Sequence, residues 1–217
     1  METQGSAVTQ GQRWSWSGVV SGMACLLLLL GGVAVQPAVA GGATEAMKNT
    51  IDEVLKIVQD KELKQPEKTQ ERRQRLEQVI GDRFDYPEMS KRSLGAPWNT
   101  LSDKDKQEFV VLFKTLLTNS YAEKIETYSG EGVQYINERT EKDYAEVRTK
   151  VLTGKTEIPL DYRLLNKGTD WRVYDVVVDG VSLVNNYRGQ FSKILRSSNY
   201  ADLVDQLRKK SEKIKAS

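Results

Sequence analysis

The sequence contains no histidine, and its single cysteine, Cys25, lies in an apolar N-terminal segment. Without histidine, Ser-His-Asp and Cys-His nucleophile systems are excluded, and the commonest metal ligand of proteins is missing. We therefore expect no metal site and no catalytic residues of these kinds. Beyond the N-terminal segment no disulfide can form, but the remaining chain is long enough to bury a core without one.

A strong excess of charge of one sign is also missing. The chain has 32 lysines and arginines against 30 aspartates and glutamates, which gives a net charge of +2. Nucleic-acid-binding domains are usually far more basic, so we expect no nucleic-acid partner. Gly154-Lys155-Thr156 resembles the end of a phosphate-binding P-loop, but Thr149 stands where that loop needs a glycine.

The N-terminal segment has the pattern of a secretory signal peptide. Arg13 precedes the uncharged stretch 18–35, and Ala38-Val39-Ala40 has the small-x-small pattern of a cleavage site. We predict that residues 1–40 are a cleaved leader and that residues 41–217 form a single domain. An uncleaved membrane anchor is the alternative, because the apolar run is just long enough to span a bilayer.

The spacing of apolar residues predicts helices first, then strands, then helices again. Three- and four-residue spacing favours helices over 43–61, 67–80, 102–125 and 199–215, with a short helix that starts near Pro87 and ends at Gly95. Alternating and β-branched runs favour strands over 133–138, 144–152, 157–166 and 171–178, joined by short polar turns. This order predicts an α+β fold, in which a twisted antiparallel sheet of about four strands packs against several helices.

The stretch 171–195 joins the last predicted strand to a helix. Its valines are apolar on both faces of the strand toward the end, which predicts a strand covered on both sides. Asp179-Gly180 is a turn signal, after which Val184, Tyr187 and Phe191 recur at helical spacing. The helix should therefore fold back over the sheet, with either a packed core or a cavity between the two layers.

Two strand carboxylates, Asp161 and Asp175, are the candidates for acid–base chemistry in a pocket. The simpler interpretation is that they bind backbone groups or pair with Arg163 or Arg172. The cluster 72–75 is most simply a solvated helix face.

Two segments, 86–125 and 171–195, resemble one known family. The residues that carry the likeness are Gly95, Trp98, Leu101-Ser102, Gln107-Glu108-Phe109, Phe113, Leu117, Tyr121, Tyr174-Asp175 and Gly180-Val181-Ser182-Leu183. In these features the chain is similar to the MlaC-type periplasmic phospholipid-binding proteins, also called the toluene-tolerance auxiliary family.

The resemblance implies a monomeric lipid shuttle in the periplasm that has no enzymatic step and no cofactor, with a bound phospholipid as cargo. Its acyl tails would lie in an apolar cavity between the sheet and the helices, and its head group would face outward. The implied partners are an inner-membrane ABC transporter with an MCE-domain subunit and an outer-membrane lipoprotein complex.

We predict lipid contacts in the strand faces and helical stripes next to that cavity, at Phe113, Leu117, Tyr121, Val147, Thr149, Tyr162, Leu164, Val173, Val177, Val184, Tyr187 and Phe191. Two other classes of function stay open. One is a small pocket enzyme with a cone-shaped fold like that of the nuclear transport factors, which would use Asp161 or Asp175. The other is a cavity-free accessory domain of an ABC transporter.

Overall fold

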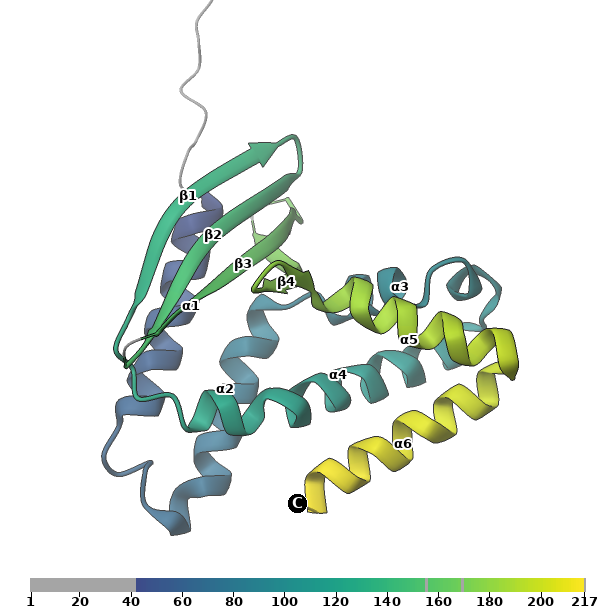
Figure 1. Ribbon diagram of the computed structural model, residues 1–217, viewed down its shortest axis with the longest axis horizontal. Helices are drawn as coiled ribbons and strands as arrows, with labels where there is room; N and C mark the ends of the chain where they lie inside the picture. The colour runs from purple at the N-terminus through teal and green to yellow at the C-terminus, as the bar shows by residue number, and fades with distance from the viewer. Residues whose placement is uncertain (1–41, 155, 169, 217) are drawn as a thin grey trace, which may run out of the picture. The chain divides into compact units, whose positions relative to one another are not determined.

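The computed structural model describes residues 42–154, 156–168 and 170–216. The predicted leader, 1–40, lies outside the described residues. In the part that is described, six α-helices accompany an antiparallel sheet whose strand order is β1-β2-β3-β4-β5. The predicted fold class, α+β with an antiparallel sheet, is confirmed (Figure 1).

The sheet is built from four long strands and one short strand, and each strand pairs antiparallel with the next one along the chain. Their bounds are β1 Val133–Glu141, β2 Tyr144–Thr153, β3 Thr156–Asn166, β4 Trp171–Val178 and β5 Val181–Ser182. The register places Ala145 opposite Leu164 and Val147 opposite Tyr162, so these buried side chains share one face. Shifts in register interrupt β1 between Tyr135 and Asn137 and β3 between Arg163 and Leu164.

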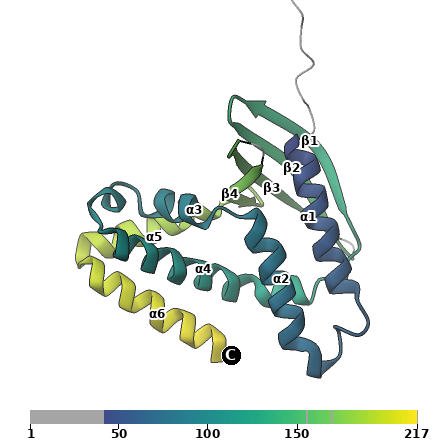
Figure 2. The same ribbon diagram turned by 180° about the vertical axis from the view of Figure 1, so that it is seen from behind.

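Helix α1, Gly42–Gln59, crosses this face of the sheet (Figure 2). Its buried residues Ala43, Met47 and Ile51 pack in one cluster with the inward side chains of β2, β3 and β4. This helix begins and ends within two residues of the predicted bounds, because its apolar stripe is long and regular.

The second predicted helix was expected to end at Ile80, before Gly81. Instead a 3-10 turn, η1 Pro66–Lys68, leads into α2, Thr69–Arg83, which runs through the glycine. Glycine costs about 1 kcal/mol in a helix interior, and tertiary contacts override that cost. Here Phe84 bridges to Val173 of β4 directly after the helix, and the Asp85 amide donates to the Val173 carbonyl at 2.8 Å.

Helices α3, Tyr86–Leu94, and α4, Asp103–Glu126, begin at side-chain caps. Asp85 accepts from the Glu88 amide, and Ser102 accepts from the Asp105 amide, as the sequence predicts for Ser102. At Gly95 the backbone has φ +70°, which a glycine adopts without strain and which ends α3. A 3-10 turn, η2 Ala96–Thr100, fills the interval before α4.

Asp175 fastens the last long strand to helix α5, Leu183–Ser197. Its carboxylate is 3% exposed and accepts hydrogen bonds from the Ser182 hydroxyl at 2.6 Å, the Val184 amide at 3.0 Å and the Arg163 guanidinium at 3.1 Å. These bonds hold α5 against the end of β4. The chain then turns at Asn199 into α6, Tyr200–Ala216, which packs along α4 (Figure 1).

In the described part of the chain, no helix combines the length and the apolar character that a membrane span requires.

Candidate functional site

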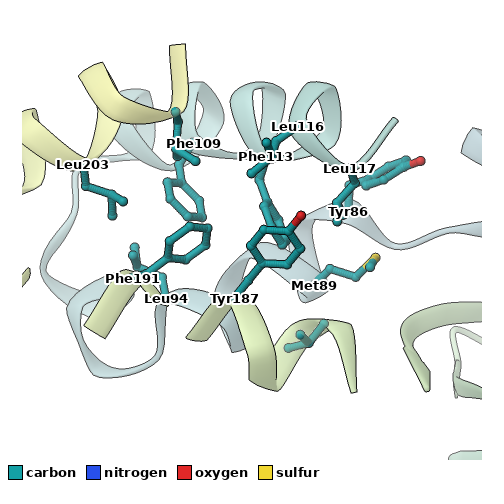
Figure 3. Close-up of a cluster of buried hydrophobic side chains, with 12 residues drawn as sticks. Tyr86, Met89, Leu94, Phe109, Phe113, Leu116, Leu117, Tyr187, Phe191 and Leu203 are labelled. Atoms are coloured by element: carbon teal, nitrogen blue, oxygen red, sulfur yellow. The ribbon is translucent and has the colours of Figure 1, made fainter. Parts of the chain in front are cut away.

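The helices α3, α4, α5 and α6 meet in a solid aromatic core. Phe109 and Phe113 project from α4 toward Tyr187 and Phe191 of α5 (Figure 3). The ring centroids of Phe113 and Tyr187 are 5.2 Å apart, and those of Phe109 and Phe191 are 5.6 Å apart, both in edge-to-face contact. None of these four residues is part of the lining of the cavity described next.

A cavity of about 430 Å³ lies on the other side, where α1, α2 and the second half of α4 face the sheet. Apolar side chains make up most of its lining. The helices contribute Met47, Ile51, Val54, Leu55, Leu76, Ile80, Met89, Leu117, Ala122 and Ile125, and the strands contribute Val133, Val151, Ile158, Leu160, Tyr162, Val176 and Val178. Its volume is in the range of cavities that hold small organic ligands.

The charged residues of the described lining are Arg73, Glu77, Lys124 and Glu126; the first three are exposed, and the Glu126 carboxylate is paired with Arg73. The phenols of Tyr162 and Tyr86 stay neutral at ordinary pH. Burial raises the pKa of Tyr162 well above its usual value and the pKa of Tyr86 to about 12. Thr149, behind the lining, donates its hydroxyl proton to the Leu160 carbonyl at 2.5 Å, so this buried polar group is satisfied. Such an interior can exclude water and accept hydrocarbon.

Charged residues gather at one place on the lining. Among the lining residues that the structure describes, three are exposed, and all three are charged: Arg73 and Glu77 of α2 and Lys124 of α4. They mark where the cavity meets solvent, between these two helices. Glu126 of α4, only 9% exposed, binds Arg73 across the gap at 2.5 Å and lies 3.6 Å from Arg72.

Three of the twelve predicted contact residues, Leu117, Tyr121 and Tyr162, line this cavity. The other nine are buried beside it. Phe113, Val184, Tyr187 and Phe191 lie in the helical core, and Val147, Thr149, Leu164 and Val173 lie on the inward face of the sheet. Val177 alternates with the lining residues Val176 and Val178, and therefore points to the opposite face.

Sequence reasoning missed most of the lining that comes from α1 and α2. The stripe of α1 was visible, but its pattern is the same for a helix over a solid core and for one over a void. Arg73 was interpreted as part of a solvated face, whereas it pairs across the opening with Glu126, which is distant in sequence. No local signal links these two residues.

The carboxylates considered for catalysis do not meet in the cavity. Asp175 holds the start of α5, and neither it nor Asp161 is part of the lining. Within the described ranges no group of three or more cysteine or acidic side chains could hold a metal ion.

Comparison with known proteins agrees with this architecture. A phospholipid-binding protein from Ralstonia solanacearum, solved in complex with a phospholipid, superimposes with a TM-score of 0.71 at 26% identity, over 79% of this chain and 98% of that one. The intermembrane phospholipid transport system binding protein MlaC of Haemophilus influenzae is 23% identical over 120 residues. This match covers 52% of the chain and 56% of that relative, so the chain spans about half the length of the curated relative it matches.

The family model described as MlaC protein matches residues 48–209, which include every described strand and the whole of α2, α3, α4 and α5. That range is most of the chain and contains both segments in which the sequence shows its likeness. The chain therefore belongs to the MlaC protein family.

Proposed function

We propose that this protein is a phospholipid carrier that holds acyl chains in the cavity between the sheet and helices α1, α2 and α4. The observation that supports this most directly is an apolar cavity of about 430 Å³ whose exposed lining residues are all charged. A phospholipid has the same division into hydrocarbon and charge. The structural neighbour from Ralstonia solanacearum, which was solved with a phospholipid, supports the same conclusion.

The energetic demand on such a carrier explains the composition of the lining. Removing acyl chain from water is worth about 0.8 kcal/mol per CH₂, so two tails of roughly 16 carbons favour a bilayer over water by about 25 kcal/mol. A carrier must offset most of this difference with apolar surface. A polar interior would instead add the cost of desolvating unpaired groups.

We assign direct acyl contact to Leu117, Tyr121 and Tyr162 among the residues predicted from sequence, together with the lining from α1 and α2. The nine other predicted residues would act indirectly. They hold in place the helices and strands that form the cavity: eight are buried in the helical core or on the inward face of the sheet, and Val177 is buried on the opposite face of β4.

The cellular role follows from the family and from the leader predicted in residues 1–40. The mature chain would be a periplasmic monomer that moves phospholipid between an inner-membrane ABC transporter with an MCE-domain subunit and an outer-membrane lipoprotein complex. The mechanism is sequestration and transfer with no covalent step, so the only bound group is the cargo lipid.

Neither alternative function has comparable support. A pocket enzyme that uses Asp161 or Asp175 needs these carboxylates in the pocket, and they are not part of its lining. A cavity-free accessory domain needs a solid interior, whereas the interior beside α1 is hollow.

Mass spectrometry of organic extracts of the purified protein tests the proposal. We expect about one phospholipid per chain in the wild type, and a large loss in Ala122→Trp and Val176→Phe, which place rings in the cavity. Ala201→Trp, on an exposed position of α6, is the matched control and should retain lipid. Thermal melting verifies that each variant is folded. A wild type without lipid, or folded cavity variants that retain it fully, would overturn the proposal.

A further inference from the structure

The opening of the cavity contains four charged side chains, and two of them, Arg73 and Glu126, form an ion pair with each other. The Arg73 guanidinium binds both oxygens of Glu126, at 2.5 Å through Nε and at 3.5 Å through a terminal nitrogen. This pair joins α2 to α4. Because a guanidinium has five N–H donors, the bond to Glu126 leaves most of them available.

Lys124 and Glu77 form no direct ion pair with any described residue, although the pKa of Arg73 is raised by its bond to Glu126 and, more weakly, by the charge of Glu77. The Lys124 ammonium lies 5.8 Å from the centre of the Tyr121 ring. Glu77 follows Arg73 by four residues, so both side chains project from the same face of α2 toward the opening. The opening therefore presents one cation on α4 and one anion on α2 that form no direct ion pair with a described residue, and the anion is only partly compensated by Arg73.

A ligand that bears both charges close together complements this arrangement. A phosphodiester accepts hydrogen bonds from an ammonium and from a guanidinium, and an amine one short linker away can pair with a carboxylate. An anionic lipid such as phosphatidylglycerol offers the phosphate alone. It would leave Glu77 unpaired beside a second negative charge.

We propose that the opening selects zwitterionic phospholipids, with the head-group phosphate between Lys124 and Arg73 and the head-group ammonium at Glu77. Phosphatidylethanolamine fits best, because its primary ammonium can donate hydrogen bonds, which a trimethylammonium cannot. This inference rests on the proposed function, since the acyl chains supply most of the affinity. The phosphate contact, which both lipids share, adds a smaller part, and the ammonium contact decides between lipids that have the same chains.

The test is a competition among lipids with identical acyl chains. The purified protein is equilibrated with vesicles that contain equal amounts of phosphatidylethanolamine and phosphatidylglycerol, and the lipids retained are quantified by mass spectrometry. Exposed charge pairs are worth little, so we expect an enrichment of phosphatidylethanolamine of about two- to fivefold over the vesicles. The enrichment should shrink as the salt concentration rises.

Two variants test the head-group ammonium contact at Glu77 and the phosphate contact at Lys124 separately. Glu77→Gln should bring the ratio of the two lipids close to that of the vesicles while the total lipid stays constant. Lys124→Gln should lower the total and keep part of the preference. The matched controls, Glu123→Gln and Lys104→Gln, change exposed residues that do not line the cavity and should resemble the wild type.

The outcomes distinguish this inference from the proposed function. Lipid bound without enrichment, or an enrichment that Glu77→Gln leaves unchanged, overturns the head-group assignment alone. No lipid in the wild type overturns both. Displacement of bound lipid by an equal concentration of inorganic phosphate or glycerophosphoethanolamine would also overturn the inference, because the site would then recognise the soluble anion rather than the lipid.

Discussion

The two halves of the described fold bury apolar side chains in opposite ways. Where α4 packs against α5 and α6, phenylalanine and tyrosine rings interlock and fill the interior (Figure 3). Where α1 and α2 face the sheet, valine, isoleucine and leucine leave a cavity of about 430 Å³. Helices α1, α2 and α4 also touch, in a cluster that includes Val58, Leu76 and Ile125, but they leave the cavity open beside the sheet. The difference indicates that the helical core supports the structure, and the sheet side offers the space in which we propose that the lipid binds.

The largest expected effect is the loss of stability when an aromatic ring is removed from the solid helical core. Phe113→Ala removes a fully buried ring from the aromatic core and should lower the free energy of unfolding by about 3–5 kcal/mol. Urea denaturation followed by circular dichroism measures this, and the lipid bound per folded molecule should be nearly unchanged. A loss of stability under about 1 kcal/mol would mean that the helical core is not solid.

The second-largest loss of stability is expected at Asp175, which connects the last long strand to helix α5. Asp175→Ala removes the buried acceptor for Ser182, Val184 and Arg163, and should cost about 2–3 kcal/mol. Asp161→Ala is the matched control on the neighbouring strand, with an expected change within about 0.5 kcal/mol. Equal costs in denaturation experiments would contradict the role we give to Asp175.

A pair of valines on one strand compares the two environments directly. Val173 is fully buried in the packed layer under α1, whereas Val178 lines the cavity. Val173→Ala should cost about 1–2 kcal/mol, and Val178→Ala less than about 1 kcal/mol, because its methyl groups already border a void. If urea titrations showed a larger loss of stability for Val178→Ala than for Val173→Ala, the void would lie elsewhere.

The smallest effect is expected at alkaline pH. Burial raises the pKa of Tyr86 to about 12 from an ordinary value of 10.0, so ionisation of this phenol favours the unfolded chain. Its contribution to stability is present below pH 10 and is lost as the pH rises toward 12. At pH 11 the wild type should lose about 1 kcal/mol more than Tyr86→Phe, relative to pH 8. Parallel denaturation curves at the two pH values measure the difference, and equal losses would show that Tyr86 does not titrate with folding.

Most of the elements were predictable because their signals are local. The stripe of α1, the cap at Ser102 and the glycine at position 95 lie within a few residues of the boundaries that they set. The end of α2 was wrong by three residues, since the pairing of Phe84 with Val173 is not visible in the local pattern.

The candidate site was harder to predict than the elements that form it. Leu117, Tyr121 and Tyr162 were named from sequence, but Phe113 and Tyr187 have the same character and lie in the solid core. A hydrophobic stripe states that a face is buried and does not state what covers it. The pairing of Arg73 with Glu126, 53 residues apart, depends on how α2 crosses α4.

The sequence by itself determined the chemistry that this protein lacks, the order of its helices and strands, and the family resemblance that the comparisons confirm. These follow from residue types and short-range spacing. Only the tertiary structure decided where the interior is solid and where it is hollow, and which charged groups stand at the opening. Both depend on distances between segments far apart in the chain, which no local pattern encodes.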